Sequence, residues 1–309
     1  MSVSPDVPKV SRAGRVPLRG NWQAMLRTAV VLFKLRIVTL LLLAAAGGAF
    51  LGAQGWPGIG SLLLILITGG MAAAGASALN QYLERESDKR MGRTRKRPLP
   101  AGMIQFPKWV LVTGMALVLL PVLAVLPFNP ALAFFLLAGA IIYVGVYTIW
   151  LKPRSVLNIV IGGAAGSAAV LSGGAAVNAW QAPGVLMLAL LLFVWTPTHF
   201  WSLAMMYRQD YRRADVPMLP ARASMRHSAF WVLLHTAVTG LAAIALGIVA
   251  GLGWLYLLPV GALTAVWLWR NGRLLIDPAP LRARSLFMFS NLYLMVVLLL
   301  VCLTTVLFS

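Results

Sequence analysis

The feature that most constrains this chain is a series of nine long apolar stretches. Each has about the 20 residues that a helix needs to cross the hydrocarbon core of a bilayer. Turn-forming residues such as Gly, Pro and Asn separate several of them. Their approximate bounds are 36–53, 58–83, 108–127, 130–151, 156–178, 183–207, 226–249, 252–270 and 285–308. Since only 11% of the residues are charged, against about 25% in soluble domains, the sequence predicts an all-α integral membrane protein with about nine transmembrane helices.

The basic residues are distributed unevenly between the two ends of these helices. If the nine spans alternate in direction, all 26 Lys and Arg residues fall on one side of the membrane or at the helix ends on that side. Because Lys and Arg accumulate in cytoplasmic loops, we expect the N-terminus and the acidic loops to be cytoplasmic and the C-terminus to lie on the opposite side. The expected location is the cell inner (plasma) membrane.

The net charge of +19 is explained by this orientation and by contact with anionic lipid. We therefore expect membrane lipid, and no nucleic acid, among the partners. The first 28 residues are basic and contain no apolar core of a signal peptide, so they are predicted to be a disordered cytoplasmic tail. Residues 29–309 are predicted to form a single membrane-embedded domain.

A stripe of three oxygen donors is predicted at the end of the second apolar helix. Asn80, Glu84 and Asp88 are spaced four residues apart, and that spacing places side chains on one face of a helix. Amide and carboxylate oxygens are hard ligands suited to Mg²⁺. The same spacing is compatible with helix-end solvation and local ion pairs to Arg85 and Lys89.

Seven Lys and Arg residues accompany these acids between positions 84 and 97. Binding to the membrane surface would explain the basic residues alone. A polyanion held between Mg²⁺ and Lys or Arg would explain both the acids and the bases, since guanidinium groups match the geometry of phosphate.

A second polar cluster lies between residues 195 and 220. It contains Asp210 and Asp215 among arginines, and His199 inside the predicted span. An ionisable residue within a membrane span is a candidate functional residue, and a hydrogen bond inside the bundle is the ordinary alternative. In a continuous helix His199 and Asp210 would share a face, about 16 Å apart.

Several motifs, in order along two thirds of the chain, resemble the UbiA superfamily of intramembrane prenyltransferases. Asn80, Glu84 and Asp88 match its first acidic motif, with Glu in place of the middle Asp. The segments that are similar to its heme-modifying branch, the protoheme IX farnesyltransferases, are 93–102, 147–152, 158–166, 198–201 and 210–220. The resemblance implies a UbiA-like bundle of helices around a central cavity.

The activity that this resemblance implies is farnesyl transfer. A farnesyl group would pass from farnesyl diphosphate to a vinyl group of heme b with addition of water, giving heme O and diphosphate, with Mg²⁺ as cofactor. The family also implies a heme A synthase or terminal-oxidase assembly proteins as partners. The alternatives are another prenyltransferase of this superfamily acting on an aromatic quinone precursor, and a transporter of an anionic lipid-like substrate.

The resemblance also implies roles for individual residues. The metal ligands would be Asn80, Glu84, Asp88 and Asp210, and these four together with Lys152 would be catalytic. The expected substrate-binding residues are Lys34, Arg36, Arg93, Arg97, Tyr147, Arg154, Asn158 and His199. His199 would ligate or position the heme iron, since imidazole is a usual axial ligand. The alternatives are that it orients the porphyrin propionates or makes a structural hydrogen bond.

Overall fold

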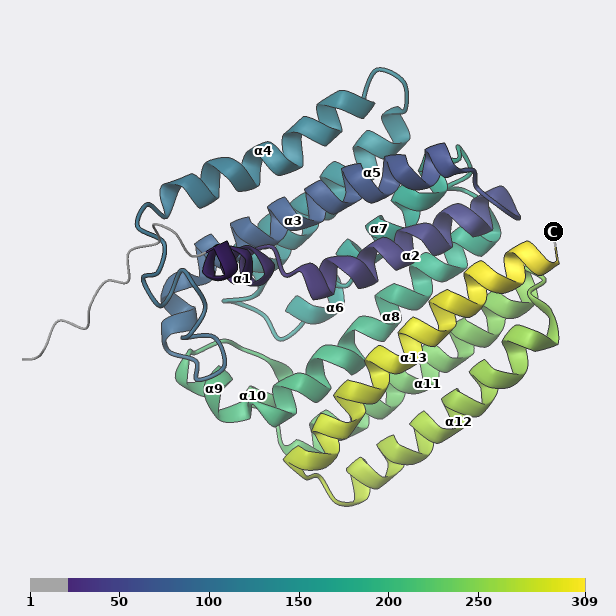
Figure 1. The fold of residues 1–309 in the computed structure, drawn as a ribbon. Coiled ribbons are helices and arrows are strands. Elements are labelled where there is room, and N and C mark those ends of the chain that lie inside the picture. The colour runs from purple at the N-terminus through teal and green to yellow at the C-terminus, as the bar shows by residue number, and fades with distance from the viewer. Residues whose placement is uncertain (1–21, 309) are drawn as a thin grey trace, which may run out of the picture.

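The computed structural model describes residues 22–308, which form helices joined by turns. The long helices run side by side, with α1, α9 and α10 at one end and the C-terminus at the other (Figure 1). We call the first of these the polar end. The helices are α1 (Trp22–Leu32), α2 (Leu35–Ala53), α3 (Ile59–Lys89), α4 (Lys108–Val125), α5 (Pro130–Ala140), the π-helix η1 (Ile141–Leu151), α6 (Asn158–Gly162), α7 (Ala164–Ala176), α8 (Pro183–Met206), α9 (Arg208–Arg213), α10 (Leu219–Arg222), α11 (Met225–Val249), α12 (Gly253–Ile276) and α13 (Pro280–Leu307).

The helical architecture predicted from the apolar stretches is confirmed. Eight segments in the described part of the chain are long and apolar enough to cross a membrane. The ninth predicted span, 252–270, forms the 24-residue helix α12 but is not among those eight. The predicted basic tail ends inside α1, so residues 22–28 are helical, and its first 21 residues lie outside the described part of the chain.

Helix starts follow the local sequence. The Asn129 side chain accepts a hydrogen bond from the Leu132 amide at the start of α5, and Ser224 accepts one from the His227 amide at the start of α11. Such caps satisfy amide groups that have no partner inside the helix. Proline also occupies an opening position of α5, α8 and α13, where its missing N–H costs nothing.

Helices α2 and α7 pack backbone against backbone through glycine. A Cβ at Gly173 would overlap the carbonyl oxygen of Ala45, and one at Gly48 would overlap the carbonyl oxygen of Val170. Without a strong hydrophobic force between helices in lipid, close approach through small residues is a main source of association. The small residues of α7 therefore bring α2 against the centre of the bundle.

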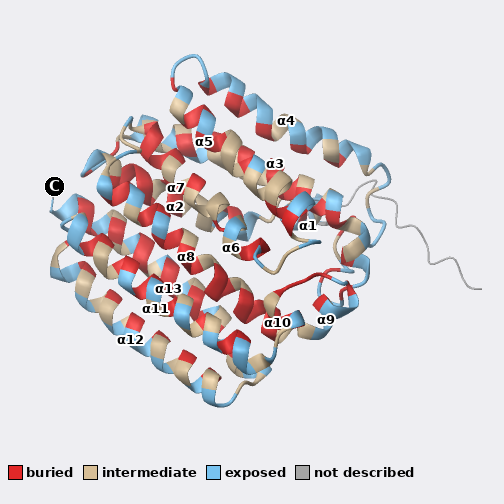
Figure 2. Ribbon diagram, turned by 180° about the vertical axis from the view of Figure 1, so that it is seen from behind, coloured by how far each residue is buried: buried red, intermediate tan, exposed pale blue. Residues whose placement is uncertain are grey.

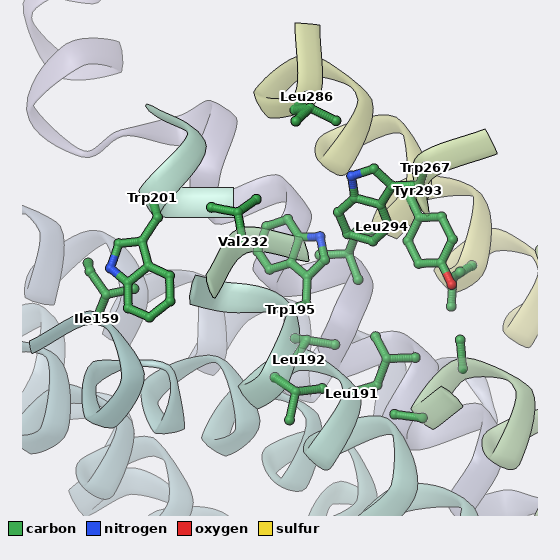
Figure 3. Close-up of a cluster of buried hydrophobic side chains, with 14 of the residues drawn as sticks. Ile159, Leu191, Leu192, Trp195, Trp201, Val232, Trp267, Leu286, Tyr293 and Leu294 are labelled. Carbon is green, nitrogen blue, oxygen red and sulfur yellow. The ribbon is translucent and has the colours of Figure 1, made fainter. Parts of the chain in front are cut away.

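Helix α8 lies at the centre of the largest apolar core. Figure 2 shows buried residues along its length. In the apolar 18-residue segment of this helix, 67% of the residues are buried. Figure 3 shows Trp195 of α8 among side chains of α11 and α13, and the Trp195 Nε1–H donates to the Ser290 carbonyl at 3.0 Å. This bond satisfies the polar atom that an indole brings into an apolar core.

The fourth predicted span changes its winding halfway along. Residues 130–140 are α-helical, and residues 141–151 form a π-helix, in which hydrogen bonds join residues five apart. Residues four or five apart then lie over one another. One face of η1 consequently carries Tyr143, then Tyr147 and Thr148, and then Lys152. In an α-helix the nine residues from Tyr143 to Lys152 would make about two and a half turns and place the two on opposite faces.

The glycine contact between α2 and α7 predicts a stability difference. Gly173→Ala should lower the free energy of unfolding by roughly 1–3 kcal/mol, the usual cost of overpacking. Gly261→Ala is the matched control, because a Cβ there meets nothing within 4 Å and alanine favours the helix. Thermal unfolding in detergent measures both, and equal Tm values for the two variants would contradict the packing argument.

Candidate active site

The three predicted oxygen donors lie together on the last turns of α3, as the four-residue spacing predicts. Asn80, Glu84 and Asp88 are 2%, 9% and 3% exposed. Burying carboxylates is costly unless they are paired and hydrogen-bonded. The end of α3 therefore requires compensating cations from elsewhere in the chain.

Each carboxylate has such a cation. Lys152 Nζ donates to Glu84 Oε1 at 2.5 Å, and Arg97 Nη1 donates to Asp88 Oδ2 at 2.7 Å. Burial by itself would lower the pKa of Lys152, but the Glu84 carboxylate, its hydrogen bond to Lys152 and the nearby Tyr147 and Tyr211 hydroxyls together raise that pKa above its ordinary value. Lys152 is therefore fully charged at neutral pH.

The alternative interpretation of this stretch was local ion pairs with Arg85 and Lys89. Such pairs are present, but they involve Glu86 and not the acids of the stripe. Lys89 and Arg85 pair with Glu86, at 2.8 Å and 3.8 Å, on the exposed side of α3. Surface pairs of this kind contribute little to stability. The stripe itself is held by Lys152, which is 68 residues from Glu84, and by Arg97, which lies nine residues after Asp88 in the loop that follows α3.

A third cation, Lys34, contacts the amide of the stripe. Its Nζ donates to Asn80 Oδ1 at 2.6 Å and to the Tyr143 hydroxyl at 3.0 Å. The Asn80 amide in turn donates to Thr148 Oγ1 at 3.0 Å. Lys34 is the second of the two residues between α1 and α2 and has a positive φ of 49°, a backbone conformation that costs energy outside glycine.

The surroundings of Lys34 disfavour its charged form. Burial lowers its pKa to about 7, and the Arg97 guanidinium adds to the lowering. A negative charge close by favours the protonated form of an amine. Lys34 thus stands where an anion would strengthen its charge.

An apolar cavity of about 280 Å³ reaches these charges through Tyr143 and Tyr147, which line it. The rest of its lining comes from α2, α3, α5, α6, α7, α8 and α13. The two tyrosine rings are stacked with centroids 5.8 Å apart. Lys34 lies 5.6 Å from the Tyr143 ring and Lys152 lies 5.5 Å from the Tyr147 ring. The charged side chains thus lie next to the apolar cavity, at what we call its mouth.

His199 lines the same cavity, as expected of a residue that contacts substrate. Its Nδ1 lies 2.8 Å from Ser290 Oγ, and its ring stacks on Trp195 and against Phe287, each with centroids 4.5 Å apart. The hydrogen bond that we gave as the structural alternative is therefore present at Nδ1. No described residue forms a hydrogen bond with Nε2, so that nitrogen is free to meet a ligand.

The helix that carries His199 is not continuous to Asp210. It ends at Met206, and α9 begins at Arg208 after a non-helical Tyr207. The Arg208 side chain donates to the carbonyls of Pro220 and Ala223, and these bonds tie the start of α9 to α10. The condition for a shared face of about 16 Å, a continuous helix, is therefore not met.

Asp210 contacts the basic loop that follows α3. Its Oδ2 accepts a hydrogen bond from the Arg93 amide at 3.2 Å, and the Arg93 guanidinium lies over the Tyr207 ring. Asp215 instead pairs with Arg222 at 2.7 Å on the exposed side. The two acidic clusters of the sequence thus meet through the loop, with Asp210 bound to its backbone.

The remaining predicted substrate-binding residues lie around the site. Arg36 is exposed and lines the cavity. Arg154 donates to the carbonyls of Ile149 and Trp150 at the end of η1. Asn158 is fully buried and donates to the Ser155 carbonyl. Neither Arg154 nor Asn158 lines the cavity.

The oxygen atoms of the stripe are compatible with a magnesium ion. In residues 22–308, no three His, Cys, Asp or Glu side chains form a group able to hold a metal, so Asp210 does not complete one carboxylate cluster with Glu84 and Asp88. The stripe offers two carboxylates and one amide oxygen. That set fits Mg²⁺, which is commonly bound by one or two carboxylates together with substrate phosphates.

Sequence reasoning missed Tyr143, Thr148 and Gln81, which also contact this site. Thr148 precedes Lys152 by four residues, but Tyr143 precedes it by nine, and that spacing places Tyr143 on the same face only in a π-helix. Gln81 is the neighbour of Asn80 and is fully buried. A polar residue beside the stripe was the available signal for it.

The comparison with family models decides the class. Residues 40–306 match the model of the UbiA prenyltransferase family. The chain belongs to this family. The match covers every described residue of the stripe and the cavity helices from position 40 onward, which excludes the transporter alternative.

The curated relatives are similar over nearly the whole chain. A protoheme IX farnesyltransferase of Metallosphaera sedula is 43% identical over 273 residues, covering 88% of this chain and 94% of the relative. One of Synechococcus sp. is 39% identical over 276 residues, covering 88% of this chain and 82% of the relative. One of Sulfolobus acidocaldarius is 40% identical over 270 residues, 87% of this chain and 93% of the relative.

Solved structures show the same fold. A digeranylgeranylglyceryl phosphate synthase superposes with a TM-score of 0.75 at 17% identity, over 92% of this chain and 99% of that one. A UbiA homolog of Archaeoglobus fulgidus bound to GPP and Mg²⁺ superposes with a TM-score of 0.59 at 14% identity, over 89% and 99%. At these identities the likeness concerns the fold alone.

The buried pair of Lys152 and Glu84 predicts a non-additive stability effect. Lys152→Met leaves a buried carboxylate without a partner and should cost roughly 3–5 kcal/mol, whereas Glu84→Gln/Lys152→Met should recover most of that loss. Lys89→Met is the control, since its exposed pair with Glu86 should contribute less than about 1 kcal/mol. Thermal unfolding in detergent reads all three variants. A double variant as unstable as Lys152→Met would show that the pair is not the cause.

Proposed function

We propose that this protein transfers a farnesyl group from farnesyl diphosphate to a vinyl group of heme b, with addition of water, giving heme O and diphosphate. The observation that carries the proposal is the closeness of the charged stripe of α3 to an apolar cavity lined by His199. Tyr143 lines that cavity and accepts a hydrogen bond from Lys34, which also binds Asn80 of the stripe. The identity of 43% to a protoheme IX farnesyltransferase supports the choice of heme as acceptor.

The diphosphate would bind at the mouth, where the protein already gathers three cations. Lys34, Lys152 and Arg97 now contact oxygens of the stripe. Asn80, Glu84 and Asp88 would hold Mg²⁺, which when bound would neutralise charge on the departing diphosphate. The three cations would then be free to donate to phosphate oxygens, and Arg93 would add its guanidinium from the loop.

The farnesyl chain would lie in the apolar cavity with its reactive carbon near Tyr143 and Tyr147. When the bond to diphosphate breaks, its electron pair leaves with the diphosphate, and the vinyl group supplies the electrons of the new carbon–carbon bond. Water then adds to the cation left on the vinyl group and loses a proton. The tyrosine faces attract positive charge, and an apolar lining keeps water from capturing the allylic cation early.

His199 would hold the porphyrin in this cavity. Its Nδ1 is engaged with Ser290, and a ring held in this way presents Nε2 to a metal. An imidazole is a usual axial ligand of heme iron. Trp195 and Phe287 keep the ring in one plane.

The orientation in the membrane is part of the proposal. The concentration of Lys and Arg at the polar end supports a cytoplasmic mouth and a C-terminus on the opposite side, and the membrane that we propose is the inner (plasma) membrane. Substrate would then enter from the cytoplasmic side of the bilayer. The partner that we expect is a heme A synthase or an oxidase assembly protein, to which the product would be transferred.

The reaction is tested with purified protein, heme b, farnesyl diphosphate and Mg²⁺, with and without EDTA. The expected product is heme b increased by the mass of a farnesyl and a hydroxyl group, and it should require the metal. Asp88→Ala should lose this product, while Glu86→Ala, an exposed acid on the same helix, should keep it. Diphosphate release only with a phenolic acceptor would assign the protein to the quinone-precursor branch.

The role of His199 is tested separately. His199→Ala should weaken heme binding by about tenfold, the effect of about 1.4 kcal/mol, and should leave the binding of inorganic diphosphate unchanged. His227→Ala is the control, because that ring contacts Trp231 near the start of α11 and does not line the cavity. Absorbance titration with heme measures the first quantity. Unchanged heme affinity would reduce His199 to its bond with Ser290.

A further inference from the structure

Gln81 forms hydrogen bonds with the backbone at the corner between α1 and α2, which contains Lys34. Its amide nitrogen donates to the carbonyl oxygens of Val31 at 2.8 Å and of Leu32 at 2.7 Å. These carbonyls lie in the last turn of α1, where the helix offers no amide four residues further on. Both hydrogens of the amide are used, and both bonds fall within three residues of Lys34.

Two consecutive residues of α3 therefore hold one corner in different ways. Gln81 holds its backbone, and Asn80 accepts from the Lys34 side chain at 2.6 Å. The Lys34 amide itself donates to Val31 at 3.3 Å, and its carbonyl accepts from Ile37 at the start of α2. The left-handed conformation of Lys34 thus depends on carbonyls that Gln81 fixes.

The hydrogen bonds of Gln81 indicate that its amide N–H groups, and not its amide oxygen, account for its presence at this position. It is fully buried, and its Oε1 accepts no hydrogen bond from any described residue. A buried acceptor without a partner costs about 1–3 kcal/mol. An apolar residue of the same size would avoid that cost and would fill the same volume, but it could not bind the two carbonyls.

Most of helix α1 does not pack on the bundle. Trp22, Met25 and Leu26 are exposed on it, and it lies across the polar end of the long helices in Figure 1. Among its described side chains only that of the last residue, Leu32, is buried, in a small apolar cluster with Ala78 of α3. Exposed apolar side chains at the end of a membrane bundle suit the lipid interface. The bonds from Gln81 are accordingly a direct link between α1 and the helix that carries the stripe.

We infer that Gln81 is a positioning residue, whose amide fixes the corner between α1 and α2 so that Lys34 Nζ points at the stripe where diphosphate would bind. This inference rests on the proposed function, since it takes Lys34 as a ligand of the diphosphate. Gln81 itself touches no reacting atom. Its effect passes through Lys34.

The test is a double-mutant cycle on the full-length protein, because two residues that act through one contact are not additive. The probe is inorganic diphosphate with Mg²⁺, and its Kd is measured by calorimetry for wild type, Gln81→Met, Lys34→Met and the double variant. Lys34→Met should weaken binding by about tenfold, the size of one hydrogen bond to a charged group. Gln81→Met should reproduce most of that loss, and the double variant should match Lys34→Met alone.

A merely structural role gives a different result. Either wild-type affinity in Gln81→Met, or a double variant whose loss is the product of the two single losses, would overturn the inference. If Gln81→Met does not fold, Gln81→Asn replaces it in the cycle, because its donors stop one methylene short of the carbonyls. Additivity with Lys34→Met would then count equally against the inference.

A local measurement complements the cycle. Amide hydrogen exchange should rise at residues 32–34 in Gln81→Met and stay unchanged in Thr68→Val. Thr68 is the matched control, being a buried polar residue of α3 whose hydroxyl bonds only within its own helix. Unchanged exchange at the corner in Gln81→Met would contradict the role given to its amide.

The cycle is independent of heme chemistry. A wild-type protein that binds diphosphate with this coupling but leaves heme b unmodified would defeat the proposed function and leave the positioning role intact. A protein that farnesylates heme b with additive Gln81 and Lys34 losses would do the reverse.

Discussion

The burial of two carboxylates at the end of a membrane helix is the constraint on which the polar end of this protein depends. Glu84 and Asp88 can remain charged there only if cations reach them from elsewhere in the chain. Lys152 arrives from the end of η1, and Arg97 arrives from a loop that folds back along α3. The π-helical winding and the path of that loop are therefore conditions for the stripe to exist.

The same pairs suit a site that alternates between an empty and a loaded state. Every acid and cation of the stripe has a partner inside the protein, so the site needs no ligand to be stable. On the proposed function, a magnesium diphosphate brings one positive and one negative component into contact with the same residues. Each protein charge then exchanges one partner for another of the same sign, and no step leaves a buried charge alone, which is the costly case.

Much of this was predictable from the sequence, because it depends on local periodicity. The lengths of the apolar stretches predicted the helices, and the four-residue spacing predicted that Asn80, Glu84 and Asp88 share a face. The partners of these residues were not predictable in detail. Lys34 reaches Asn80 through a left-handed backbone residue, and Tyr143 aligns with Lys152 only because η1 is wound with five-residue bonds. Both are effects of tertiary packing that no local pattern indicates.

The second acidic cluster shows how one such effect changes the interpretation of a residue. A continuous α8 would have pointed Asp210 along the face of His199, toward a metal or a substrate. The turn at Tyr207 instead brings the Asp210 carboxylate to the Arg93 amide. Arg93 lies four residues before Arg97, which pairs with Asp88. Asp210 thus acts on the stripe at a distance, since it holds the loop that supplies one of the stripe's cations, and the two acidic clusters form one connected site.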